Sequence, residues 1–139
     1  PPDQTGGAGG PRVEGPARRG RMWYDHLAGE LGIGITEALV KQCIQRKEPD
    51  AFALSSRGAE WFAGVGIVVA AARALRRKFA ATCLDWSERR DHLGGALGAA
   101  LAERLVDLGW IARKRNSRAV SVTEAGRRKL EEEFRLNLA

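Results

Sequence analysis

The side chains best suited to chemistry are two histidines, each of which directly follows an aspartate in the sequence. His26 and His92 occupy equivalent places in two similar segments, and Cys83 and Asp85 lie a short distance before His92. Imidazole nitrogens, thiolates and carboxylates are common ligands of transition metals. The four side chains therefore form a candidate metal or effector site, although their spacing matches no standard ligand pattern. The alternative interpretation is structural: each aspartate caps a helix, and the backbone holds its histidine.

The basic run Arg113-Lys-Arg-Asn-Ser-Arg118 is the candidate site for nucleic acid. Its cations, Arg113, Lys114, Arg115 and Arg118, are expected on an exposed turn, from which they can contact DNA phosphates or enter the minor groove. The whole chain carries 23 Lys and Arg against 17 Asp and Glu, and its net charge of +6 favours an anionic partner such as duplex DNA. The alternatives are a solvated turn and an arginine excess that serves only solubility.

The sequence shows no pattern that is typical of an enzyme. It contains no recognisable Ser-His-Asp arrangement, phosphate-binding glycine loop or pair of carboxylates in a pocket-like context. No cofactor is predicted, apart from the metal or small-molecule effector of the candidate site. Five aromatic residues could line a pocket for such an effector or pack in the core between units: Trp23, Tyr24, Trp61, Trp86 and Trp110.

The two Asp-His pairs belong to an internal repeat. Residues 25–44 align with residues 91–110 at an offset of 66, and nine of the twenty aligned pairs are identical. The similarity resumes further along, where Leu54-Ser-Ser-Arg-Gly58 matches Val122-Thr-Glu-Ala-Gly126. Similarity at a fixed period indicates that one supersecondary unit is used twice. We therefore expect the same helix-turn-helix in both segments.

The second copy predicts the order of a winged helix. Residues 92–97 are expected to form a short helix that Asp91 caps and Gly98 ends, and residues 99–108 form a second helix. Strands at 110–113 and 119–122 flank the basic turn, and Thr123 caps a last helix from 124 to about 136. The second helix would be the recognition helix, but its exposed positions offer few groups that read bases: Ala99, Ala102, Glu103, Arg104 and Asp107.

The first copy follows the same plan with a reduced wing. Residues 23–31 and 36–44 are its predicted helix pair, residues 45–50 replace the wing tip, residues 52–54 are a residual strand, and Ser55 caps a helix through Ala63. The predicted fold is therefore mainly α with small β wings (α+β), a tandem winged-helix-like repeat.

Four segments are expected along the chain. Residues 1–20 form a disordered leader or linker rich in Gly and Pro, residues 21–67 the first unit, residues 68–90 a connecting segment with an amphipathic helix at 68–79, and residues 91–139 the second unit. The chain begins without Met, and we expect a fragment of a longer protein. Two cysteines do not make a disulfide framework, and no apolar run is long enough to span a bilayer, so a cytoplasmic protein without membrane contact is expected.

Several longer motifs carry a family resemblance over residues 21–136. They are Tyr24-Asp-His-Leu-Ala-Gly-Glu-Leu-Gly32, Cys83-Leu-Asp-Trp-Ser-Glu-Arg-Arg90, Leu108-Gly-Trp110 and Ser117-Arg-Ala-Val120. This region resembles the C-terminal part of ArsR-type helix-turn-helix regulators. Those proteins usually have a cysteine just before the Tyr-Asp-His motif, where this chain has Trp23, so no role of that cysteine can be carried over.

The resemblance implies a regulatory module of a bacterial repressor. Such a module acts in effector response or dimerisation, as a homodimer, while an N-terminal winged helix that this sequence does not contain carries the operator contacts. The second wing would then add contacts to the DNA backbone. The alternative function is a protein-interaction module that contacts neither DNA nor a ligand.

Overall fold

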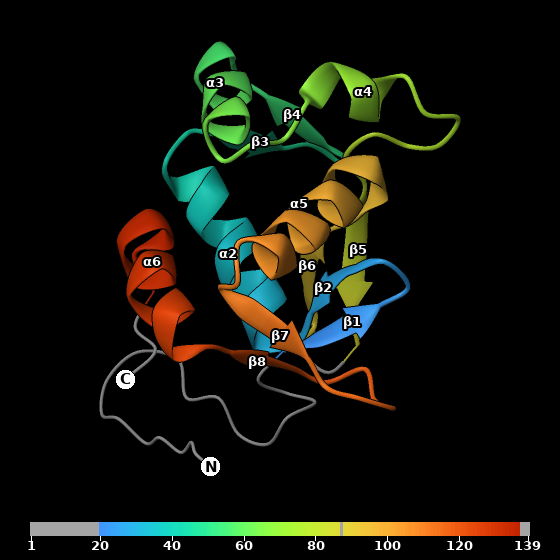
Figure 1. The fold of residues 1–139 in the computed structure, drawn as a ribbon. Helices are drawn as coiled ribbons and strands as arrows, with labels where there is room; N and C mark the ends of the chain where they lie inside the picture. Colours follow the sequence, from blue (N-terminus) through green and yellow to red (C-terminus); the bar gives the residue numbers. More distant parts are fainter. Residues whose placement is uncertain (1–19, 87, 137–139) are drawn as a thin grey trace.

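The computed structural model describes residues 20–86 and 88–136 and shows a mixed α+β protein (Figure 1). Within these residues, five helices accompany four two-stranded antiparallel sheets, each of which is a hairpin. None of the described helices combines the length and the apolar character that a membrane span needs.

The order of the elements repeats. The first unit consists of β1 (Arg21–Trp23), β2 (His26–Ala28), α2 (Gly29–Lys41), β3 (Gln45–Lys47), β4 (Phe52–Leu54) and α3 (Ser56–Gly64). The second unit has the same order: β5 (Thr82–Asp85), β6 (Arg90–Leu93), α5 (Gly95–Asp107), β7 (Ile111–Arg113), β8 (Val120–Val122) and α6 (Glu124–Phe134). The short helix α4 (Val69–Arg73) lies between them and is shorter than the connecting helix predicted at 68–79. Each unit is thus a hairpin, a helix, a second hairpin and a second helix.

The predicted helix-turn-helix is wrong in both units, because a hairpin stands where the first helix was expected. His26 lies in β2 and His92 in β6, and a single long helix follows each strand. Gly98 does not end a helix but lies inside α5, where a Cβ would come within 2.5 Å of the Leu93 carbonyl oxygen. Gly32 has the same role in α2, against the carbonyl of Leu27. These glycines let the preceding strand pack directly on the helix.

The predicted aspartate caps are also wrong. Ala28 and Gly94 occupy the N-cap positions of α2 and α5, and neither makes a side-chain capping hydrogen bond. Asp25 lies in the turn between β1 and β2, and Asp91 lies within β6, paired with Leu84. Both aspartates precede the helix by several residues, because a strand intervenes.

The second half of each unit agrees better with the predictions. Ser55 caps α3 by accepting from the Gly58 N–H at 2.9 Å, and Thr123 caps α6 by accepting from the Gly126 N–H at 2.8 Å, so both predicted caps are confirmed. The predicted second wing is the hairpin β7–β8. The first wing is more complete than expected, since β3 and β4 form a full hairpin.

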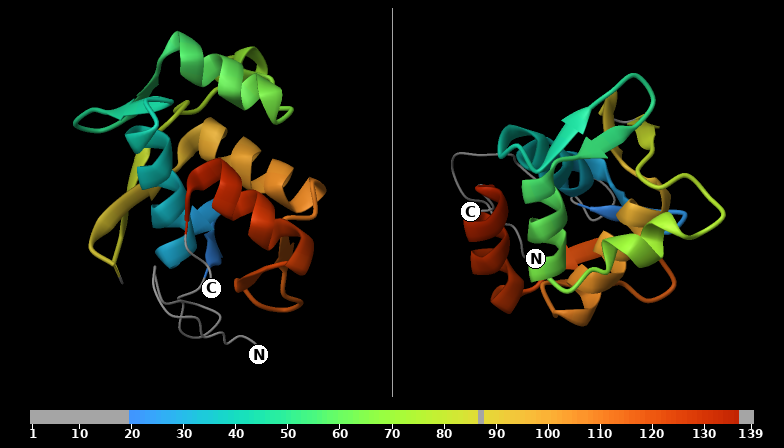
Figure 2. Two further views of the ribbon diagram at one scale, coloured as in Figure 1. Left: turned by 90° about the vertical axis from the view of Figure 1, so that its left-hand side faces the viewer. Right: turned by 90° about the horizontal axis from the view of Figure 1, so that it is seen from above.

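The two units pack into each other rather than side by side. The hairpin strand β2 contacts α5 of the second unit, and β6 contacts α2 of the first. The contacts are reciprocal, as they would be about a twofold axis. α6 packs against α2, and it lies beside α3 in the view from above (Figure 2). The rings of Trp61 in α3 and Phe134 in α6 are in contact, with centroids 5.4 Å apart. Buried side chains of both units therefore form one hydrophobic core.

Candidate functional site

The crossed hairpins bring the two repeated histidines face to face. The Nε2 atoms of His26 and His92 lie 3.0 Å apart, and the ring centroids are separated by 4.9 Å. The two residues are 5% and 1% exposed. Because they are equivalent in the repeat, their contact is the meeting point of the two units. The histidines are thus held by each other, and not by the backbone as the structural alternative proposed.

Cys83 adds a third potential ligand to this pair. It lies directly opposite His92 in the β5–β6 hairpin, so the two side chains share one face of the sheet. One ligand atom from each of His26, Cys83 and His92 lies within 4.8 Å of the other two. The first hairpin has the same register, with Trp23 opposite His26. The sequence prediction thus named three side chains that the fold places together, although 57 residues separate His26 from Cys83.

Asp85, the fourth predicted site residue, lies beside His92, on the side of the imidazole that faces away from His26. Its buried carboxylate accepts hydrogen bonds from the Gly29 N–H at 2.7 Å and the Glu88 N–H at 3.2 Å, and it pairs with Arg21 at 3.1 Å. Its Oδ2 lies 3.7 Å from Nδ1 of His92. Gly29 is the first residue of α2, so Asp85 also satisfies the start of a helix that lacks a local cap. The carboxylate therefore joins the second hairpin to the first unit.

Asp25 lies beside His26 as Asp85 lies beside His92, with its carboxylate facing Nδ1 of the imidazole. Its Oδ1 lies 3.5 Å from Nδ1 of His26, and its Oδ2 accepts from Arg77 at 2.6 Å. The hydrogen bond to Arg77 holds the pKa of Asp25 below its usual value. Each imidazole consequently turns Nε2 toward the cluster and Nδ1 toward a carboxylate.

Both histidines are neutral near pH 7. Burial lowers the pKa of His92 to about 4, with a further contribution from nearby His26. Burial also lowers the pKa of His26, although Asp25 opposes the shift. Burial, with Asp85 and Asp91 nearby, raises the pKa of the Cys83 thiol. The free cluster therefore holds two neutral imidazoles, one of which donates its Nε2–H to the other, beside a protonated thiol.

The basic turn between β7 and β8 is the second candidate site. Every residue from 112 to 118 is exposed, and Arg113, Lys114 and Arg115 form no ion pair with other described residues. Arg118 anchors the turn to β1, because its guanidinium lies 5.5 Å from the centroid of the Trp23 ring and its carbonyl accepts the Met22 N–H at 2.7 Å. The turn is thus an exposed group of cations on a fixed base.

The predicted recognition helix does not have the expected exposed face. Ala102 of α5 is buried, since the hairpin β1–β2 packs on this helix. Glu103 and Asp107 are exposed acidic side chains, which repel DNA phosphates, and Arg104 donates to the Val65 carbonyl. This face of α5 is therefore poorly suited to contact DNA.

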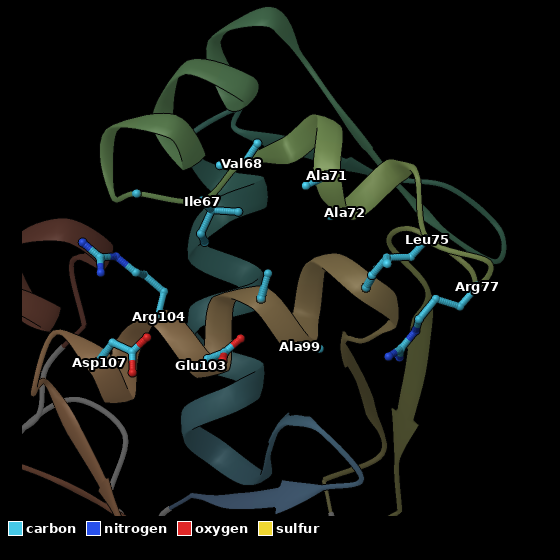
Figure 3. Close-up of a pocket in the computed structure, with 13 residues that line it drawn as sticks. Ile67, Val68, Ala71, Ala72, Leu75, Arg77, Ala99, Glu103, Arg104 and Asp107 are labelled. Carbon is cyan, nitrogen blue, oxygen red and sulfur yellow. The ribbon is translucent and has the colours of Figure 1, made fainter.

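A groove that the sequence did not reveal lies between α4 and α5 (Figure 3). Its volume is about 430 Å³, and small or apolar side chains line it on both sides, including Ile67 and Ala72 at α4 and Ala99 on α5. Arg77, Arg104 and Asp107 lie at its edge. The only signal in the sequence is the run of alanines at 70–72, which are too small to fill the space between the helices.

The five aromatic residues that could line a pocket or pack in the core lie in different surroundings. Tyr24 and Trp86 are exposed, whereas Trp61 and Trp110 pack against the hydrophobic core. Trp23 makes an edge contact with Tyr24. For Trp61 and Trp110, the alternative of core packing is therefore the one observed.

Comparisons with known proteins complete this description. No family model matches the chain, and no solved structure matches it. Over 107 residues the chain is 43% identical to the uncharacterized HTH-type transcriptional regulator YdfF of Bacillus subtilis (strain 168). The match covers 77% of this chain and 47% of that protein, so the chain corresponds to about half the length of its relative. The chain is therefore related to an HTH-type transcriptional regulator.

Proposed function

We propose that the chain is the regulatory module of a bacterial transcription regulator of the ArsR type. In this proposal the cluster between the units responds to an effector, and the basic turn adds contacts to the DNA backbone. The observation that carries the proposal is the 43% identity to a helix-turn-helix regulator, of which the match covers 47%. The helix-turn-helix expected in this chain is replaced by hairpins, so sequence-specific recognition is assigned to another part of the regulator.

Contact with the phosphate backbone is supported by the basic turn. The described residues from 112 to 118 contain four cations and no acidic side chain, and all of them are exposed. A compact group of cations on a hairpin tip can approach phosphates without reading bases. A homodimer would present two such turns to one duplex, in keeping with the twofold symmetry of most operators.

The test is binding of the chain to duplex DNA of random sequence, measured by fluorescence anisotropy over a series of salt concentrations. Changing Arg113, Lys114, Arg115 and Arg118 together to alanine should weaken binding equally for all sequences. Each lost phosphate contact should also reduce the slope of log affinity against log salt by roughly one unit.

A matched control removes the same charge from other surfaces of the protein. Lys41, Arg57, Arg128 and Lys129 are exposed on α2, α3 and α6, and their joint change to alanine also removes four positive charges. We expect this control variant to keep most of the salt slope. Equal loss in both variants would show that net charge alone attracts DNA. No binding by the parent chain at low salt would favour the alternative of an interaction module without DNA contact.

A further inference from the structure

We propose that His26, Cys83 and His92 bind one divalent transition-metal ion of the zinc class between the two repeat units. This inference deepens the effector-response part of the proposed function by naming the class of effector. Two neutral imidazoles and one thiolate are a typical donor set for Zn²⁺. They leave a fourth position for water or another ligand.

The separations in the cluster are close to those of a tetrahedral site. With Zn–N bonds of about 2.0 Å and Zn–S bonds of about 2.3 Å, two nitrogens lie about 3.3 Å apart, and sulfur lies about 3.5 Å from each nitrogen. The two Nε2 atoms are 3.0 Å apart, and all three ligand atoms lie within 4.8 Å of one another. The imidazoles need to separate by a few tenths of an ångström, and the thiol needs to move by slightly more than an ångström at most.

The carboxylates behind the histidines match the usual surroundings of a metal ligand. A ligating imidazole generally donates its other N–H to a carboxylate or carbonyl, which fixes the tautomer and the ring orientation. Asp25 faces Nδ1 of His26 at 3.5 Å, and Asp85 faces Nδ1 of His92 at 3.7 Å. In the free cluster one histidine carries its proton on Nε2 for the mutual hydrogen bond, so only the other can donate from Nδ1. Metal binding lets both histidines donate to their carboxylates.

The proton balance of this step is simple. The histidine that donates Nε2–H in the free cluster changes tautomer and carries its proton on Nδ1, and no proton is lost from either ring. The Cys83 thiol loses its proton to solvent and becomes the thiolate that binds the ion. One proton is therefore released for each metal ion bound. Cys83 is only half-buried, which provides a path for the ion from solvent.

The repeat identifies the position that would complete the site. Trp23 lies opposite His26 in the same register in which Cys83 lies opposite His92. Residues directly opposite in an antiparallel pair share one face of the sheet. A cysteine at position 23 would therefore place a second sulfur on the side of the cluster that mirrors Cys83, and the set would become Cys₂His₂, a closed zinc site. The substitution Trp23→Cys is a gain-of-binding test of the geometry.

The experiment uses the chain without a polyhistidine tag, stripped of metal with EDTA and titrated with Zn²⁺ or Co²⁺. We expect one Zn²⁺ per chain by elemental analysis after dialysis, and a Co²⁺ complex whose absorption shows tetrahedral and thiolate–cobalt bands. Cys83→Ser should remove the thiolate band and weaken Zn²⁺ binding. Loss of a residue that only hydrogen-bonds to a ligand weakens metal binding by about 10- to 100-fold, and loss of the ligand itself should weaken it by more. Trp23→Cys should strengthen Zn²⁺ binding by about tenfold or more.

Cys43→Ser is the matched control, because Cys43 is the other free cysteine and lies exposed outside the cluster. This variant should keep both the stoichiometry and the spectrum. Binding that survives Cys83→Ser unchanged, or that disappears with Cys43→Ser, would overturn the assignment. A folded parent chain that takes up no Zn²⁺ at micromolar concentrations would overturn it as well. Metal uptake is measured without DNA, so its failure is distinct from a failure of the basic turn to bind phosphate.

Discussion

Replacing Asp85 by alanine should be among the most destabilising single substitutions at the interface between the two units. The carboxylate is fully buried and pairs with Arg21, whose side chain is only 19% exposed. It also accepts the Gly29 N–H, the first donor of α2. Removing one partner of a buried ion pair costs about 3–5 kcal/mol, and the low end of this range applies here because the Arg21 side chain keeps some exposure to solvent. Asp85→Ala should therefore lower the free energy of unfolding by about 3 kcal/mol or more, and Asp85→Asn by less, since the amide oxygen still accepts one hydrogen bond.

The assay is urea denaturation in EDTA, monitored by circular dichroism and tryptophan fluorescence. An unchanged slope of the unfolding free energy against urea concentration shows that the variant unfolds from an equally compact folded state. Glu48→Ala is the matched control. Glu48 pairs with Arg46 at 2.7 Å, a shorter distance than the 3.1 Å between Arg21 and Asp85, but both side chains of this control pair are well exposed. Exposed pairs contribute about 0–1 kcal/mol. If Asp85→Ala costs no more than Glu48→Ala, burial does not decide the strength of this contact and the reasoning fails.

Two further predictions concern stability. Gly126→Ala should lower the free energy of unfolding by about 1–3 kcal/mol, because a methyl group there would overlap the Trp110 carbonyl, whereas Gly64→Ala at the open end of α3 should be neutral or slightly stabilising; thermal unfolding of both variants tests this contrast. In EDTA, stability should fall as the pH drops from about 6.5 toward 4, since the unfolded chain protonates its histidines in this window while buried His92, with its pKa of about 4, stays neutral. Urea midpoints at stepwise lower pH that do not change would contradict the neutral state of the cluster.

The helices and strands show which features of the fold a local sequence pattern can predict. Ser55 and Thr123 were correctly predicted as caps, because a capping side chain bonds to an N–H only three residues away. The strands that precede α2 and α5 lie in segments that the sequence predicts as helices, and Gly98 looks like the end of the second of these. Gly98, and Gly32 at the equivalent position, in fact lie inside long helices. Their actual role depends on the strand backbone that packs against them, and no local pattern shows that contact.

The candidate sites also contain some features that the sequence predicts and others that it does not. The repeat was enough to single out His26 and His92, because equivalent positions in a duplicated unit are visible in one sequence, and donor chemistry added Cys83 and Asp85, which lie a few residues before His92. The groove between α4 and α5 and the burial of Ala102 could not be predicted, since both result from elements that are distant in the chain.

The duplication, the caps of the closing helices and the basic turn are therefore predictable from the amino-acid sequence, because they depend on residues close together or on direct comparison of two segments. The opening hairpins, and the packing of each hairpin on the helix of the other unit, depend instead on contacts between distant segments and are visible only in the folded protein. That crossing places His26 against His92 across 66 residues of chain. Its physical reason is burial: each hairpin covers its apolar face with the partner unit's helix, and the equivalent histidines then meet where the two units join.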